Sequence, residues 1–181
     1  MNPIWIIVTI CVFSLICSSF AGGAYWFLTF STPSPLTGTP VKQLGSFSMN
    51  PWGSASNFID KQAQWIWNID TAATDAPLTP IKFSTQFMNS SLSELPATLH
   101  VIVDNSATVT LNGTKIGDVA GGGWATQDYS KIKMNLKSGN NIIDIVAANA
   151  GGPAGLIASL VKDSDKSVLM RTDSSWVWNN A

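Results

Sequence analysis

Hydrophobic and polar positions divide this chain into two parts with different patterns. Residues 4–30 are almost continuously apolar, and no Asp, Glu, Lys or Arg occurs before Lys42. From Phe47 onward, short apolar or alternating runs are separated by Gly, Pro, Asn and Asp, as in all-β domains. Helical periodicity is nearly absent there. The pattern predicts an N-terminal membrane segment followed by a β domain.

The apolar segment has the length and composition of a transmembrane helix. Its Ile, Val, Leu and Phe side chains each favour insertion by roughly 0.3–0.6 kcal/mol near the bilayer centre, and no charge opposes them. A helix from Trp5 to Trp26 rises roughly 32 Å, close to the hydrocarbon thickness, which places both rings and Tyr25 at the membrane interfaces. We expect one uncleaved span over residues 4–30.

A cleaved secretory signal is the alternative, because Ser19-Phe20-Ala21 is an acceptable cleavage site. Against it, a basic n-region is missing and the apolar run continues through residues 25–28. Cys11 and Cys17 lie inside the segment, where apolar packing is their simplest role. Flanking charges are too sparse to fix the orientation. We expect the C-terminal domain to be extracytoplasmic or to face an outer shell.

Residues 31–45 have the composition of a stalk. Pro33, Pro35 and Pro40 stand among Ser, Thr and Gly, which disfavours regular structure and favours extended conformers. Such a segment would lift the following domain, residues 46–181, away from a bilayer.

The β domain is expected to hold eight to ten strands in a β-sandwich, because an open sheet of that size would leave an apolar face uncovered. Residues 142–148 and 156–161 are the most continuously apolar and should be central. Asn112-Gly113 predicts a tight hairpin turn and Ser138-Gly139-Asn140 a second turn. The predicted strands are 63–67, 81–87, 98–104, 108–111, 114–119, 131–136, 141–148, 155–162, 167–171 and 176–178.

Charge and composition argue against two classes of function. Ten Lys plus Arg face eleven Asp plus Glu, for a net charge of −1, so no basic surface for nucleic acid is expected. His100 is the only histidine and Glu94 the only glutamate, so groups for acid–base catalysis are scarce. We therefore predict no enzymatic activity. A hydrolase is favoured only if His100 meets a Ser and an Asp in a cleft.

The order of several short segments resembles that of galactose-binding-like jelly-roll modules, which accompany rhamnosidases, β-galactosidases and other glycan-active proteins. The segments that carry this resemblance are Trp65 with Trp67, 101–104, 109–117, 136–143, 149–156 and 173–176. The resemblance covers about residues 46–178 and implies a jelly-roll β-sandwich that binds without catalysing. Ligand sites of this family lie in variable loops at one end of the sandwich. The resemblance therefore predicts the fold better than it predicts which sugar is bound.

The resemblance also implies a structural calcium ion as an option, although no cofactor is required. Oxygen ligands of suitable hardness are Asp70, Asp75, Asp163 and Asp165. Their spacing matches no dedicated calcium loop, so solvated turn residues are the simpler interpretation. No Cys or His set suits zinc.

Exposed aromatic rings are the candidate carbohydrate-binding groups, since a ring face stacks on a sugar while nearby polar groups bond its hydroxyls. Trp124 follows Gly121-Gly122-Gly123 and precedes Gln127 and Asp128; Trp52 in a Pro-Trp-Gly turn is the second candidate. The alternative for both tryptophans is capping of the sandwich core. Two sequons, at Asn89 and Asn112, are candidate glycosylation sites.

Together these features favour a membrane-anchored, non-enzymatic β-sandwich with a structural or adhesive role. Such a protein would tether a bilayer to neighbouring structural proteins or glycans, and a minor capsid protein of a virus with an internal membrane is one concrete version. A cell-surface, lectin-like carbohydrate-binding module is the alternative, favoured if Trp124 is exposed among polar neighbours.

Overall fold

Twelve strands and almost no helix make up the described part of the chain, residues 34–53, 57–126 and 128–181 of the computed structural model. The two helical turns are η2 (Asp70–Ala73) and α1 (Gly123–Thr126). No helix among these residues is long and apolar enough to cross a membrane. The expected span at 4–30, with Trp5, Tyr25 and Trp26, lies outside them.

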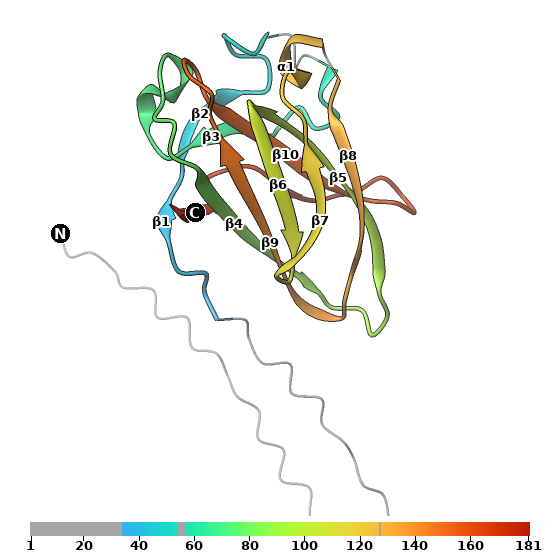
Figure 1. Ribbon diagram of the computed structural model, residues 1–181. Coiled ribbons are helices and arrows are strands. Elements are labelled where there is room, and N and C mark those ends of the chain that lie inside the picture. The colour runs from blue at the N-terminus through green and yellow to red at the C-terminus, as the bar shows by residue number, and fades with distance from the viewer. Residues whose placement is uncertain (1–33, 54–56, 127) are drawn as a thin grey trace, which may run out of the picture. The chain divides into compact units, whose positions relative to one another are not determined.

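The strands form two antiparallel sheets (Figure 1). The first sheet has the order β1 (Thr39–Pro40), β12 (Val177–Asn180), β4 (Ile81–Asn89), β9 (Gly139–Ala148), β6 (Ser106–Leu111) and β7 (Thr114–Val119). The second sheet has the order β2 (Lys42–Ser46), β3 (Gln64–Trp67), β10 (Gly155–Lys162), β5 (Leu95–Asp104) and β8 (Ser130–Leu136), and β11 (Val168–Arg171) also pairs with β10.

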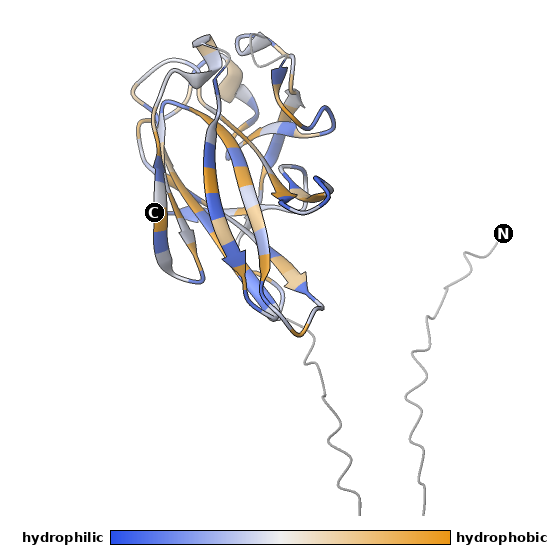
Figure 2. Ribbon diagram, turned by 90° about the vertical axis from the view of Figure 1, so that its right-hand side faces the viewer, coloured by the Kyte–Doolittle hydropathy of each residue, from blue (hydrophilic) through white to orange (hydrophobic). Residues whose placement is uncertain are grey.

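The main core lies between the sheets and follows from the period-2 alternation of side chains. In β9, Ile143, Ile145 and Ala147 are fully buried while their neighbours are partly exposed. Figure 2 shows the same alternation as hydrophilic and hydrophobic bands along the strands. Alternate burial of this kind indicates that one face of each strand packs inward.

A second core cluster covers the outer face of the second sheet. In β5 and β10, Val103 and Leu156 pack in the main core, whereas the adjacent Ile102 and Ile157 belong to the second cluster. Because successive side chains point to opposite faces, these central strands are buried on both sides. The second core cluster consists of Trp52, Phe58, Ala63, Trp65, Ile102 and Ile157.

The structure confirms the predicted β-sandwich of two sheets and a strand in each of the ten predicted places. Asn112 and Gly113 occupy the turn between β6 and β7 with φ values of 52° and 78°, as a tight hairpin requires. The predicted stalk, 31–45, is too long. Thr39–Pro40 pairs with β12 and Lys42–Ser46 pairs with β3, so the sandwich begins before residue 46.

Candidate functional site

Several loops meet at one end of the sandwich, where β5 ends and β8 begins. In Figure 1, α1 lies at this end beside the segment that connects β2 and β3. We call it the loop end, and it comprises residues 47–53, 57–63, 104–105, 120–126 and 128–130. It contains the described members of the predicted sugar site, whereas Gln127 lies outside the described residues.

Trp52 belongs to the second core cluster and not to the surface. Its side chain is fully buried, and its ring stacks on that of Trp65 with centroids 4.4 Å apart. Gly155 permits this packing, because a Cβ there would lie 2.8 Å from Trp52 Cη2. The prediction of Trp52 as a sugar platform is wrong, since the ring has no free face, and the core-capping alternative describes it correctly.

Asp104, at the end of β5, is a buried carboxylate held by tryptophan. Trp52 Nε1 donates a hydrogen bond to Asp104 Oδ2 at 3.0 Å. Burial raises the pKa of Asp104, and the indole N–H groups of Trp52 and Trp124 act in the opposite direction. The buried Nε1 of Trp124 has no hydrogen-bond partner within the described residues. Asp104 thus ties the end of β5 to Trp52 of the second core cluster.

Trp124 is half-buried against the second core cluster rather than freely exposed. Of the three glycines before it, Gly121 and Gly123 are explained by close backbone approach, whereas Gly122 has a positive φ of 86°. A Cβ on Gly121 would collide with the carbonyl oxygen of Asn105, and one on Gly123 with that of Asp128. Packing therefore requires Gly121 and Gly123, and backbone conformation favours glycine at position 122, which the expectation of a merely flexible segment missed.

A hollow of about 180 Å³ opens between α1 and the start of β8. Its lining includes the predicted Asp128, which is exposed, and the half-buried Tyr129, which the sequence did not single out. The Tyr129 ring makes an edge contact with Phe58 and a tilted contact with His100, so its orientation is fixed by packing. A carboxylate beside a fixed aromatic ring can bond sugar hydroxyls and cover an apolar sugar face.

His100 is buried on β5, directly opposite Ser159 of β10. Burial, followed by the charge of Lys131, lowers the pKa of His100, and its Nδ1 has no partner within the described residues. Ser159 Oγ donates to Asp60 Oδ2 at 3.0 Å. Ser159 thus bonds the Asp60 carboxylate and not the His100 imidazole. These three residues therefore lack the serine–histidine hydrogen bond of a catalytic triad.

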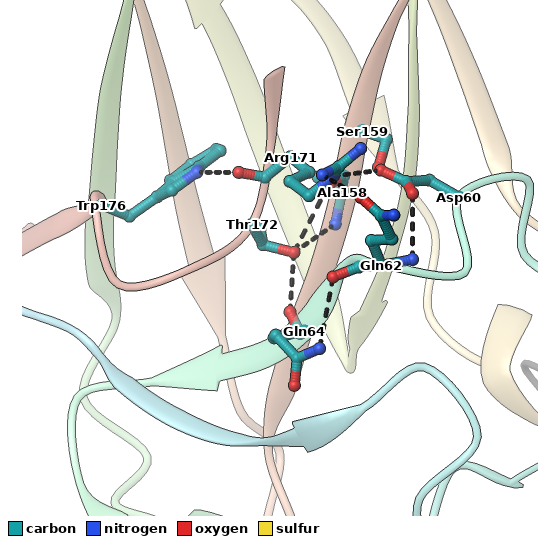
Figure 3. Close-up of polar contacts among 8 residues, drawn as sticks. All are labelled: Asp60, Gln62, Gln64, Ala158, Ser159, Arg171, Thr172 and Trp176. Carbon is teal, nitrogen blue, oxygen red and sulfur yellow. Dashed lines mark hydrogen bonds and ion pairs between the residues drawn. The ribbon is translucent and has the colours of Figure 1, made fainter. Parts of the chain in front are cut away.

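Asp60 is the centre of a polar network that fastens the loop before β3 to the second sheet (Figure 3). Its carboxylate accepts hydrogen bonds from Ser159 Oγ, from Gln62 N at 3.0 Å and from Arg171 Nε at 2.7 Å. Thr172 Oγ1 donates to Gln64 O at 2.7 Å beside it. The buried groups satisfy one another, which is the pattern of a structural network.

The four aspartates considered for calcium do not gather. Asp70 pairs with Lys42, Asp165 pairs with Lys162, and Asp163 accepts a hydrogen bond from Thr98 Oγ1 at 2.7 Å. Among the described residues, no three His, Cys, Asp or Glu side chains are grouped as a metal site requires.

The two sequons differ in accessibility. Asn89 is 2% exposed, and its Nδ2 donates to the carbonyl oxygens of Ser93 and Leu136. The expectation of a glycan there is wrong for the folded domain, since the acceptor nitrogen is enclosed. Asn112 is exposed in its turn, where its Nδ2 donates to Asn141 Oδ1 at 3.2 Å.

Comparison with known proteins indicates the fold more strongly than the family. Neither a protein-family model nor a curated protein matches this chain significantly. A lectin from Pleurotus ostreatus, solved in complex with GalNAc, is 26% identical with a TM-score of 0.50 over 66% of this chain. An α-L-rhamnosidase from Streptomyces avermitilis, complexed with L-rhamnose, is 26% identical with a TM-score of 0.54 over 83% of this chain.

This domain has a galactose-binding-like β-sandwich fold. A family 78 rhamnosidase from Bacillus sp. GL1, 23% identical over 66% of this chain and 13% of its own, shows the same fold with a TM-score of 0.54. The chain spans 35% of the lectin's length and 14% of the Streptomyces enzyme's length. The resemblance seen in the sequence is thus confirmed for the fold.

Proposed function

We propose that this galactose-binding-like domain is a non-catalytic carbohydrate-binding module held at a membrane by residues 4–30. The observation that carries the proposal is the hollow at the loop end, where the exposed Asp128 carboxylate lies beside the packed Tyr129 ring. The likeness to a lectin solved with GalNAc supports it. The separation of Ser159 from His100 by its bond to Asp60 favours binding over hydrolysis.

In this proposal Asp128 accepts hydrogen bonds from sugar hydroxyls, and Tyr129 covers an apolar sugar face. Half-buried Trp124 holds α1 against the second core cluster and so shapes the hollow from behind. This role differs from the open stacking platform expected from the sequence. Carbohydrate recognition would then depend on Asp128 directly and on Trp124 through the position of α1.

The test uses the full-length chain in phosphatidylcholine nanodiscs, because many detergents carry sugars themselves. A glycan array identifies bound sugars and calorimetry measures their affinity. Asp128→Asn should weaken the affinity about 10-fold or more, since a hydrogen bond to a charged group contributes about 1.5–3 kcal/mol. Glu94→Gln, an exposed carboxylate change at the opposite end of β5, is the matched control. Sugar binding that is equal in both variants would reject the loop-end site.

A structural tether is the second candidate function. The charge-free segment 4–30 and the proline-containing linker precede the β domain, an order suited to holding that domain away from a bilayer. The domain would then join a bilayer to an outer protein layer, as a minor capsid protein of a membrane-containing virus would. Cross-linking in the native membrane tests this candidate. Cross-links to one abundant shell protein, with an array free of bound glycans, would replace carbohydrate binding with tethering. Intact-mass measurement tests the anchor, and a mature N-terminus near Gly22 would reject it.

A further inference from the structure

His100 connects the interior of the second sheet to the loop-end hollow. It lies on β5, directly opposite Lys131 of β8. The Tyr129 ring packs on its imidazole with the two ring centroids 5.3 Å apart, and Tyr129 also lines the loop-end hollow. A titratable group therefore contacts the aromatic ring to which the proposed function assigns an apolar face of the sugar.

The imidazole of His100 is enclosed in a way that suits its neutral form. The residue is 7% exposed, and its buried Nδ1 has no hydrogen-bond partner within the described residues. An imidazolium carries a hydrogen on each ring nitrogen, so the charged form would hold an N–H donor at Nδ1 without an acceptor. Such a buried charge is costly. Protonation therefore favours an arrangement in which the ring reaches water.

The nearby charges do not compensate a proton on this ring. Lys131 faces it from β8, while Asp163 and Lys166 lie in the turn after β10. Burial is the main cause that lowers the pKa of His100; Lys131 and Lys166 act in the same direction and Asp163 opposes them. Repulsion by the two lysines thus adds to the cost of burying an imidazolium.

Asp60 approaches from the loop before β3 but is already paired. Its carboxylate accepts hydrogen bonds from Ser159 Oγ at 3.0 Å and from Arg171 Nε at 2.7 Å (Figure 3). Ser159 is the residue of β10 that lies opposite His100. Because the Arg171 guanidinium compensates the charge of Asp60, this carboxylate is not a free counter-ion for the imidazolium.

Tyr129 would transmit a change at His100 to the hollow. Its ring makes an edge contact with Phe58 at a centroid distance of 5.8 Å, and Lys131 Nζ lies 5.2 Å from its centroid. Protonation of His100 would place a second cation beside this ring, and the two cations repel each other. Asp128 precedes Tyr129 and lines the same hollow, so displacement of the ring would disturb both groups proposed to contact sugar.

We propose that His100 is a pH switch for the loop-end site, in which the neutral imidazole keeps Tyr129 in its sugar-binding position and protonation releases it. This inference rests on the proposed carbohydrate-binding function and adds its regulation. By linkage, bound sugar opposes protonation of His100 by the same factor by which protonation weakens sugar binding. The domain would hold glycan near neutral pH and release it in mildly acidic surroundings.

The test is calorimetry on the full-length chain in phosphatidylcholine nanodiscs from pH 8 to pH 5, with galactose, GalNAc and L-rhamnose as probes. These neutral sugars do not titrate in this range. The wild-type affinity should be constant above about pH 6.5 and then fall, by at most about 10-fold per pH unit for one proton. His100→Gln should lack this fall, while Asp104 and Asp128 titrate in both proteins and cancel in the ratio of affinities.

Two lysines of β8 provide a second test that keeps His100 in place. Lys131→Met removes a charge that lowers the pKa of His100, so the affinity should begin to fall at a higher pH than in the wild type. Lys133→Met is the matched control, since this exposed lysine of the same strand is not among the charges that shift His100. The same pH profile in the wild type and Lys131→Met would contradict the switch.

Hydrogen exchange without sugar distinguishes failure of the switch from failure of the proposed function. At pH 5 the wild type should exchange faster than His100→Gln at residues 128–132, because only the wild type has an imidazole to protonate. Equal exchange, together with sugar binding that stays constant from pH 8 to pH 5, would reject the switch and leave the proposed function standing. If no probe binds at any pH, the proposed function is rejected and this inference with it.

Discussion

Asp60 and Arg171 are 111 residues apart in the sequence, yet Arg171 Nε donates to Asp60 Oδ2 at 2.7 Å. The aspartate side chain is 5% exposed and the arginine side chain 31%. The pair joins the loop before β3 to β11 (Figure 3). It thereby fixes the loop that contributes Phe58 and Ala63 to the second core cluster.

Removing either partner of this ion pair should destabilise the domain, but by different amounts. Arg171→Met leaves a buried carboxylate without its cation and should destabilise the domain by about 2 kcal/mol. This cost is smaller than that of breaking a fully buried pair, because the arginine side chain is partly exposed. Asp60→Asn keeps an acceptor for Ser159 and leaves a guanidinium that can reach water, so about 1 kcal/mol is expected. Chemical denaturation measures both. The reverse order would contradict this account of the network.

The ten strands from residue 64 onward were predictable because their signals are local. Alternation and turn residues such as Asn112-Gly113 depend on neighbours within a few positions. β1 and β2 lack such a signal, since Thr39–Pro40 is exposed and Lys42–Ser46 is at most half-buried. Their strand conformation comes from pairing with β12 and β3, which the local sequence does not encode.

The candidate site was only partly predictable because burial depends on distant residues. Trp52 stands in a turn-like sequence, yet Trp65 and the missing side chain of Gly155 create the space that buries it. Asp128 was predicted because it lies in a polar loop after glycines, and it lines the loop-end hollow. Tyr129 was missed, since only its contacts with Phe58 and His100 distinguish it from an ordinary strand residue.

The effect of substitutions at Gly113, in the hairpin turn between β6 and β7, on stability should depend on backbone conformation alone. A Cβ on Gly113 would meet no atom within 4 Å, but the residue has a φ of 78°. Gly113→Val should therefore destabilise by about 1 kcal/mol or more, since β-branched residues are strained at positive φ. Gly113→Asn is the control, because asparagine tolerates this region. Equal thermal midpoints for the two variants would contradict the conformational explanation.

The packing of Trp52 against Gly155 should be visible in a double-mutant cycle. A Cβ on Gly155 would lie 2.8 Å from Trp52 Cη2 and 2.9 Å from Trp65 Cε3, so Gly155→Ala should cost about 1–3 kcal/mol through overpacking. Trp52→Phe removes the indole atoms of Trp52 that lie farthest from its backbone. In the double variant this change should recover part of the cost of Gly155→Ala. Additive changes in the free energy of unfolding would show that the close approach is not limiting.

Burial of His100 should make stability depend on pH below neutrality. Burial is the main cause that lowers its pKa; Lys131 and Lys166 act in the same direction and Asp163 opposes them. In the unfolded chain its pKa is about 6.5, so below that pH the unfolded state binds more protons than the folded state. The free energy of unfolding should therefore fall as the pH drops from about 6.5 toward the lower folded pKa, and His100 contributes no slope above that window.

His100→Gln isolates this contribution, because the carboxylates, including Asp104, titrate in both proteins and cancel in the difference. Denaturant midpoints measured from pH 8 to pH 5 should converge or cross as the wild type loses stability relative to the variant. A constant difference over the whole range would mean that the imidazole is hydrated in the folded domain. Because Tyr129 packs on His100, the same titration should alter Tyr129 fluorescence only in the wild type, which ties the pH effect to the loop end.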